Sequence, residues 1–253
     1  MGARTEHAPG TFSWVDLTTS DSEAAKSFYG SLFSWDFDDN EIPGGGIYSM
    51  CTLGGDNVAA IYQAADDQAR HWNSYVTVAG TDDAAARAKV LGGTVVEEPF
   101  DVMEAGRMAR IQDPTGAALC LWQPGESIGA TRVNDPGCLT WNELHTPDPG
   151  AALEFLTGLF GWATQEMEAG EGPAYTVVQV GDRSNGGVMA AQEGEPPHWI
   201  PYFTVESRDA TAEKAAALGG REYHRMEMPQ GGIAILSDPQ GAPFGVWAGE
   251  IDD

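Results

Sequence analysis

Basic side chains are scarce in this chain of 253 residues. Lysine and arginine together number 13, against 38 aspartates and glutamates, so the formal net charge is −25 at pH 7. Such a negative field repels nucleic acids and anionic membrane surfaces, whereas it attracts cationic ligands. We therefore expect neither nucleic acid nor a membrane as partner, and a solvated acidic surface is the simplest explanation of the charge.

Long apolar segments and cysteines are also few. No run of about 18 apolar residues occurs, which argues against a membrane-spanning helix. The first ten residues lack the apolar stretch of a signal peptide. The three cysteines, Cys51, Cys120 and Cys138, are an odd number in unrelated contexts. Free thiols are typical of the reducing cytoplasm, so the sequence predicts a cytoplasmic protein.

Tryptophan, by contrast, is abundant and regularly spaced. The eight tryptophans form four pairs, three separated by 127 residues and one by 125: Trp14 with Trp141, Trp35 with Trp162, Trp72 with Trp199, and Trp122 with Trp247. Neighbouring segments agree, because FSWVDLTTSDSEAAKSFYGSLFSW (12–35) aligns with LTWNELHTPDPGAALEFLTGLFGW (139–162). This period exceeds the roughly 20–50 residues of solenoid repeats and indicates two similar domains, each large enough to bury a core.

Each half contains the same order of predicted elements twice. Asp21 is placed to cap a helix over 22–33, with one strand-like segment before it and three after it. A second helix again stands between one strand and three, and the turn DPTG joins the last two strands. The sequence thus predicts an α+β fold of two tandem domains, 10–125 and 136–250, joined by a linker over 126–135.

Three of these features together resemble the vicinal oxygen chelate superfamily: a strand followed by a capping aspartate, a helix ending in Phe-Tyr-x-x-Leu-Phe, and a closing Asp-Pro-x-Gly hairpin. That superfamily includes glyoxalase I, extradiol dioxygenases, fosfomycin-resistance enzymes and bleomycin-binding proteins. The chain is most similar to its tandem-domain actinobacterial proteins labelled hydroxylase or glyoxalase-like. The resemblance implies that each domain pairs two βαβββ modules into a concave sheet. Because fused duplicates usually keep the interface of the dimer they replaced, we expect a monomer that acts as a pseudo-dimer.

Catalytic members of the superfamily hold a divalent metal with His, Gln or Glu on the first and last strands of paired modules. His145 alone cannot supply three convergent ligands. We therefore expect no bound catalytic metal, and no other cofactor is indicated. The ligand positions, carried over by counting from the capping aspartate and the Asp-Pro-x-Gly turn, fall on residues unsuited to such a metal: Trp14, Tyr75, Cys120, Trp141, Tyr202 and Gly245.

The same positions predict a ligand-binding face. Side chains two positions apart share one face of a strand, and in the resembling fold this face forms the cavity. An aromatic-walled cleft with few polar groups suits a flat apolar ligand. The aromatics could instead fill and close the cleft, and both interpretations stay open. The predicted ligand-binding residues are Trp14, Asp16, Tyr75, Thr77, Cys120 and Trp122 in the first domain, and Trp141, Tyr202, Thr204 and Trp247 in the second.

Glu143 and His145 are the candidate catalytic residues, because alternation places both on the cavity face of their strand. They could act as general acid and base or as two metal ligands. Only the second domain could use them, since Thr18 stands in place of His145 in the first. His71 and His198 repeat with the scaffold, which favours a structural role for both.

Three classes of function remain open. The first, which we favour, is a metal-independent protein that binds a small aromatic or cationic compound, such as a natural product or drug held by sequestration. The second is an enzyme of the glyoxalase or dioxygenase fold, a lyase, isomerase or hydroxylase that is either cofactor-free or metal-dependent. The third is an interaction protein whose clefts are closed. Because Glu143 and His145 add polar groups, we expect the second domain to hold the working site.

Overall fold

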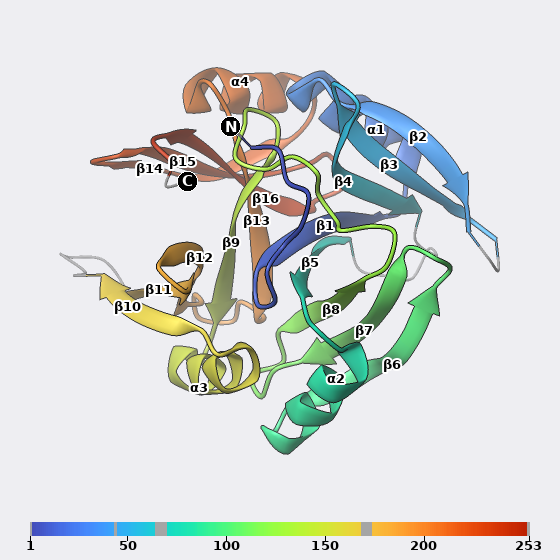
Figure 1. The fold of residues 1–253 in the computed structure, drawn as a ribbon. Coiled ribbons are helices and arrows are strands. Elements are labelled where there is room, and N and C mark those ends of the chain that lie inside the picture. The colour runs from blue at the N-terminus through green and yellow to red at the C-terminus, as the bar shows by residue number, and fades with distance from the viewer. Residues whose placement is uncertain (1, 43–44, 64–69, 168–173, 252–253) are drawn as a thin grey trace.

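The computed structural model describes residues 2–42, 45–63, 70–167 and 174–251. Within these residues the chain folds into two eight-stranded sheets and four helices (Figure 1). One sheet is formed by each half of the chain. The strand orders are β2-β3-β4-β1-β5-β8-β7-β6 and β10-β11-β12-β9-β13-β16-β15-β14, so the two halves have the same topology.

Each half places one helix after each of its two leading strands, as the sequence predicts. The first half consists of β1 (Phe12–Thr19), α1 (Ser22–Phe33), β2 (Asp36–Glu41), β3 (Ile47–Leu53), β4 (Asp56–Gln63), β5 (His71–Thr77), α2 (Thr81–Val90), β6 (Thr94–Val102), β7 (Gly106–Gln112) and β8 (Ala118–Pro124). The second half consists of β9 (Leu139–Thr146), α3 (Pro149–Phe160), β10 (Ala163–Met167), β11 (Tyr175–Val180), β12 (Arg183–Ala190), β13 (His198–Thr204), α4 (Arg208–Ala217), β14 (Arg221–Met228), β15 (Gly231–Ser237) and β16 (Pro243–Gly249). The predicted α+β fold of tandem βαβββ modules is confirmed.

Asp21 and Asp148 begin the helices α1 and α3 in the same way. Each carboxylate accepts a hydrogen bond from the backbone N–H three residues later, at 3.0 Å in both helices. This bond satisfies a donor that the first turn of a helix leaves without a partner. Both helices end at a residue in the left-handed conformation, Ser34 and Gly161 respectively. Local sequence therefore decides where these elements start and stop.

The first strand of each module lies at the centre of its sheet. Strand β1 pairs antiparallel with β5, and β5 pairs parallel with β8. In this register Trp14 lies opposite Tyr75, and Tyr75 lies beside Cys120. The second sheet repeats the arrangement, with Trp141 opposite Tyr202. The three central strands of each sheet thus carry the predicted site residues side by side.

The faces of the sheets that carry the helices bury two apolar clusters, each made by both halves. Helix α1 lies beside α4, and α2 lies beside α3 (Figure 1). Helix α1 also packs on strands of the other half: the ring of Phe33 lies 5.0 Å from that of Phe203 on β13, and the ring of Tyr29 lies 5.4 Å from that of Phe244 on β16. The two halves are therefore held together by apolar burial rather than by the linker alone.

Two tryptophans, one in each half, donate a hydrogen bond to the backbone of the other half. Trp35 Nε1 donates a hydrogen bond to the Gly137 carbonyl at 2.8 Å, and Trp162 Nε1 donates to the Gly10 carbonyl at 2.7 Å. Trp35 and Trp162 are 127 residues apart, and so are Gly10 and Gly137. Reciprocal contacts of this kind characterise a two-fold interface. They support the proposal that the two halves keep the interface of an ancestral dimer.

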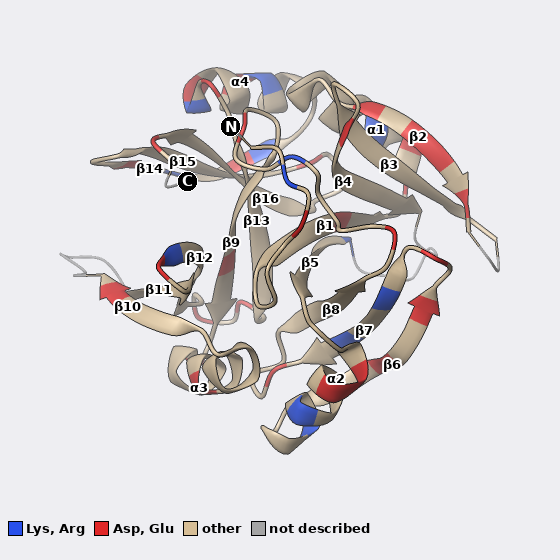
Figure 2. Ribbon diagram, viewed as in Figure 1, with Lys and Arg blue, Asp and Glu red and all other residues tan. Residues whose placement is uncertain are grey.

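Acidic side chains are spread over the outer elements, including β2, β6 and α2, with few basic ones among them (Figure 2). Arg107 is one of these cations, and its guanidinium bridges Asp82 at 2.7 Å and Asp101 at 2.8 Å. Among the described residues, no helix has the length and apolar character needed to cross a membrane.

Candidate functional site

In the first domain, Asp16 is the centre of a buried hydrogen-bond network. Its carboxylate accepts hydrogen bonds from Tyr75 Oη at 2.6 Å, from Tyr48 Oη at 3.0 Å and from Asn73 Nδ2 at 2.8 Å. Tyr48 Oη in turn accepts a hydrogen bond from Trp14 Nε1 at 2.9 Å. Burial raises the pKa of Asp16, although its hydrogen bonds oppose that shift. Strand alternation therefore places Trp14 and Asp16 on one face, as predicted.

The second domain repeats this network around Glu143. Tyr202 Oη donates a hydrogen bond to Glu143 Oε1 at 2.8 Å, and Trp141 Nε1 donates to Tyr175 Oη at 2.9 Å. Burial raises the pKa of both tyrosines, and the charge of Glu143 adds to the shift. Both phenols thus keep their protons. Glu143 has one further partner, because His145 Nε2 lies 2.9 Å from its Oε1.

The aromatic face of the first sheet is filled. Trp14, Tyr75 and Trp122 are only 7%, 7% and 8% exposed. They form one apolar cluster that includes Ala130, a fully buried residue of the predicted linker. Trp122 Nε1 also donates a hydrogen bond to the Ser127 carbonyl at 3.0 Å. The linker therefore covers this face, and the aromatic side chains of the first domain fill its cleft.

The corresponding face of the second sheet has less cover among the described residues, although the Glu250 carbonyl accepts a hydrogen bond from Trp247 Nε1 at 3.1 Å, as the Ser127 carbonyl does from Trp122. Its apolar cluster consists of strand residues of the same sheet, and Trp141 and Trp247 are only partly buried. Tyr202, on the strand between them, is 2% exposed. The second domain thus presents an accessible aromatic wall next to the buried carboxylate of Glu143, whereas the first domain does not.

Three more of the predicted ligand-binding residues are buried near these networks. Thr77 Oγ1 donates a hydrogen bond to Ser13 Oγ at 2.7 Å. Thr204 Oγ1 has no hydrogen-bond partner in the described part of the chain, and Thr204 lines a cavity of about 410 Å³ between the linker and the ends of β13 and β16. Burial raises the pKa of the Cys120 thiol, so this group stays protonated and is a poor nucleophile.

In the second domain, the residues at the metal positions carried over from the superfamily do not fit a metal. The Tyr202 hydroxyl bonds to Glu143, and the Trp141 indole bonds to Tyr175. A β-carbon on Gly245 would lie 2.2 Å from the Tyr202 ring, so no side chain can be placed there. An indole N–H offers no lone pair to a metal, and a glycine has no side chain to offer one. No chemical step is therefore assigned to a metal at these positions.

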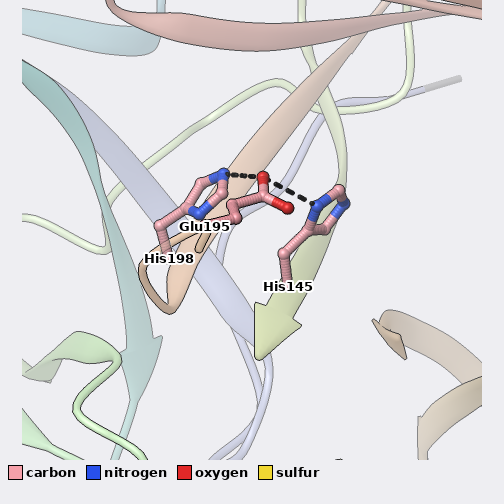
Figure 3. Close-up of side chains that lie close together, drawn as sticks. All are labelled: His145, Glu195 and His198. Carbon is pink, nitrogen blue, oxygen red and sulfur yellow. Dashed lines mark ion pairs between the residues drawn. The ribbon is translucent and has the colours of Figure 1, made fainter. Parts of the chain in front are cut away.

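His145 is not isolated, and the argument that it could not gather three ligands is wrong. Glu195 Oε1 lies 3.5 Å from His145 Nδ1 and 3.6 Å from His198 Nε2 (Figure 3). One ligand atom from each of the three side chains lies within 4.8 Å of the others. Burial opposes protonation of His145, but Glu143 and Glu195 outweigh it and raise the pKa of the imidazole. The structural role predicted for His198 stays a prediction, although this residue lies in the cluster with His145 and Glu195.

Sequence reasoning missed four residues of these networks: Tyr48, Asn73, Tyr175 and Glu195. The two tyrosines are 127 residues apart, so the period of the tryptophans could have identified them. Glu195 corresponds to Gln68 at that period, so the repeat carries no signal for it. Only the connection between β12 and β13 brings Glu195 to His145.

The model of the glyoxalase-like domain family matches this chain twice, over residues 14–122 and 141–247. The protein named "Putative glyoxylase CFP32" of Mycobacterium bovis is 47% identical over 254 residues, which cover 97% of each chain. The anthracycline biosynthesis protein DnrV of Streptomyces peucetius is 34% identical over 260 residues, which cover 96% of this chain and 94% of that protein.

Solved structures share the fold at low sequence identity. The Mn(II)-bound glyoxalase of Novosphingobium aromaticivorans has a TM-score of 0.69 at 14% identity, over 100% of this chain and 85% of that chain. The 2,3-dioxygenase LapB of Pseudomonas sp. KL28 also has a TM-score of 0.69, at 15% identity, over 98% of this chain and 93% of that chain. The fold is therefore that of the vicinal oxygen chelate superfamily. Within it, this chain belongs to the glyoxalase-like domain family.

Proposed function

We propose that this chain binds a flat aromatic small molecule on the concave face of its second sheet, and that the contact needs no metal ion. The proposal rests on one observation, the partial exposure of Trp141 and Trp247 on a face whose apolar cluster consists of strand residues of the same sheet. A pair of stacked aromatic rings gains about 0.5–1.5 kcal/mol beyond the free energy of burial. A ligand that contacts both indoles gains this stabilisation twice.

The polar group beside the indoles limits the chemistry of the ligand. Glu143 is 6% exposed and accepts a hydrogen bond from Tyr202. A carboxylate has acceptor positions for several donors, so a hydroxyl or ammonium group of the ligand is complementary to it. The net charge of −25 also attracts cations. These features favour an aromatic compound that carries a hydroxyl or amine substituent.

One relative supports the same class of ligand. DnrV, which is 34% identical to this chain, is named for anthracycline biosynthesis. Anthracyclines are flat aromatic compounds with hydroxyl and amine substituents. A natural product of this shape, held by sequestration or presented for modification, is the ligand class that we propose.

Tryptophan fluorescence tests the proposal. An anthracycline titrated into the protein in the presence of EDTA should quench part of the emission until the site is saturated. A parallel titration of free tryptophan amide corrects for light absorbed by the dye. Trp141→Phe should remove most of the saturable quenching, because Trp141 is partly exposed on the open face. Trp14→Phe is the matched control, since Trp14 is the repeat partner in the filled cleft, and it should keep the quenching.

Two outcomes would contradict the proposal. Equal loss of quenching in the two variants would place the ligand away from the second sheet. If no flat aromatic compound in a panel gives saturable quenching, the chain is better explained as an interaction protein with closed clefts.

One contact favours an enzyme as the second candidate function. His145 Nε2 and Glu143 Oε1 lie 2.9 Å apart, and both residues are buried beside the aromatic wall. A carboxylate and an imidazole in this geometry can move a proton to and from a bound substrate. Chromatography and mass spectrometry of the bound compound after incubation would detect turnover. Glu143→Gln should then abolish turnover even at compound concentrations high enough to saturate the fluorescence quenching, whereas an unchanged compound would leave binding as the function.

A further inference from the structure

The rim of the second sheet carries two histidines and a glutamate that the proposed binding function does not use. We propose that His145, Glu195 and His198 bind a divalent transition-metal ion of the zinc, cobalt or nickel type. His145 and His198 face each other across the antiparallel pair β9–β13, and Glu195 reaches between them from the β12–β13 connection (Figure 3). None of the three stands at the positions carried over from the superfamily, which hold Trp141 and Tyr202 on these strands.

Both imidazole rings are held by an acceptor on their outer side. His145 Nε2 lies 2.9 Å from Glu143 Oε1, and His198 Nδ1 lies 2.8 Å from the Pro196 carbonyl oxygen. A ring nitrogen that faces such an acceptor carries the proton, so the other nitrogen of a neutral ring has a free lone pair. The nitrogens that remain, His145 Nδ1 and His198 Nε2, are those that face Glu195. Metal-binding histidines typically have this outer hydrogen bond.

Three acceptors therefore converge on one point. Glu195 Oε1 lies 3.5 Å from His145 Nδ1 and 3.6 Å from His198 Nε2. Ligand atoms around a tetrahedral zinc ion are about 3.4 Å apart, given metal–ligand bonds of about 2.1 Å. Converging lone pairs repel one another unless a cation lies between them. Two imidazoles and one carboxylate favour a zinc-like ion over magnesium or calcium, which prefer oxygen ligands.

The first domain supplies a cation of its own at the corresponding place. Arg110 Nη2 lies 3.2 Å from Nε2 of His71, the repeat partner of His198. Arg110 pairs with Cys120 in the first sheet, and the equivalent pair in the second sheet is Ile235 with Gly245. Ile235 contributes no charge. The second domain thus lacks the arginine on this strand and has a second histidine at the rim.

Solvent reaches the cluster from one side. The side chains of Glu195 and His198 are 27% and 28% exposed, whereas that of His145 is 10% exposed. An ion can therefore enter from solution and keep water as an additional ligand. Glu143 contacts both His145 and Tyr202, so the ion would lie next to the proposed ligand cleft.

Zinc binding tests the proposal. The protein is prepared without a histidine tag and is freed of metal by a chelator. Calorimetric titration with Zn²⁺ should give one equivalent, and Co²⁺ should give the visible absorption of a site with nitrogen ligands. His198→Gln and Glu195→Gln should each weaken zinc binding about tenfold or more, because each removes one ligand. His71→Gln is the matched control in the first domain and should bind zinc as the parent does.

Circular dichroism and the metal-free unfolding midpoint establish that each variant is folded. Glu195 lies on a connection and is partly exposed, so Glu195→Gln separates loss of a ligand from loss of structure. Zinc uptake well below one equivalent by the parent would overturn the proposal. A protonated His145 would then supply the positive charge of the cluster. Equal zinc affinity in the parent and in both ligand variants would overturn it as well.

Discussion

Asp16 and Glu143 show how one duplicated position acquired two chemical environments. Each is a buried carboxylate that accepts a hydrogen bond from a tyrosine of the adjacent strand. Asp16 is also bonded by the Asn73 amide, whereas Glu143 is bonded by the His145 imidazole. The Asn73 amide extends the first network to Thr18 and His71, whereas the second nitrogen of the His145 imidazole extends the other network to Glu195 at the sheet rim.

Asp16→Asn should gain stability relative to the parent protein as pH rises. Burial raises the pKa of Asp16, so the folded protein keeps this proton to a higher pH than the unfolded chain. Between the two pKa values the folded state binds more protons, and the free energy of unfolding of the parent falls as pH rises. Asparagine has no such proton. Urea unfolding of both proteins at several pH values from 5 to 8 measures the difference.

Asp82→Asn serves as the control for this pH dependence. The Arg107 hydrogen bond lowers the pKa of the exposed Asp82, so this carboxylate changes no charge between pH 5 and 8. Its variant should show no trend relative to the parent over that range. A flat or falling difference between Asp16→Asn and the parent would contradict the raised pKa of Asp16.

The three thiols should be unreactive in the native protein. Cys51, Cys120 and Cys138 are all buried. Burial raises the pKa of Cys138 to about 12 and raises those of the other two thiols as well, and only a thiolate attacks a disulfide reagent. Ellman's reagent should therefore modify no thiol in buffer and all three in guanidinium chloride. Rapid modification of a thiol in the native protein would show that its site opens to solvent.

At the scale of elements, the linker is what distinguishes the two clefts. Its Ala130 N–H donates to the Ser13 carbonyl at 2.8 Å, and its Thr131 N–H donates to the Asn57 carbonyl at 2.9 Å. The N-terminal segment adds a further bond, from the Arg4 N–H to the Thr131 carbonyl at 2.7 Å. A segment that the sequence marks only as a connection thus covers the first sheet.

Gly129→Ala should loosen this cover. Gly129 has a φ of +94°, and a β-carbon there would lie 2.4 Å from the Ser13 carbonyl oxygen. Gly55→Ala is the control, because Gly55 has a φ of +91° with no atom within 4 Å of the added carbon. Both variants bear the left-handed strain of about 1–2 kcal/mol, but only Gly129→Ala adds a clash. Its free energy of unfolding should be lower than that of Gly55→Ala by about 1 kcal/mol or more.

Acrylamide quenching gives a second measurement of the same prediction. A loosened linker should expose Trp122, whose indole N–H bonds to the linker carbonyl of Ser127. Quenching should therefore increase in Gly129→Ala and stay unchanged in Gly55→Ala. Equal stability and equal quenching in the two variants would show that the linker does not seal the cleft.

At the scale of the whole molecule, the two halves should unfold as one unit. Phe203 of the second half is fully buried and packs on Phe33 of the first half, with ring centroids 5.0 Å apart. Calorimetry should show one transition, with equal calorimetric and van't Hoff enthalpies. Phe203→Ala should lower the free energy of unfolding by about 3–5 kcal/mol and shift the whole transition. Two resolved transitions, in the parent or in this variant, would mean that the halves are independent domains.

The sequence by itself determined the modules, their order and the faces of their strands. Capping residues such as Asp21 and Asp148, strand alternation and the 127-residue period are properties of short segments or of their repetition. They can therefore be identified without knowledge of the fold. Alternation placed Trp14 with Asp16 and Trp141 with Glu143, and both placements match the hydrogen-bond networks.

Only the tertiary structure decided which cleft is closed and which side chains meet at the rim. The path of the linker over Trp122 depends on backbone bonds to strands far away in sequence. The meeting of His145 with Glu195 and His198 depends on the register between β9 and β13 and on the course of the connection before β13. Contacts of this kind follow from strand pairing between distant segments, and local sequence patterns carry no information about them.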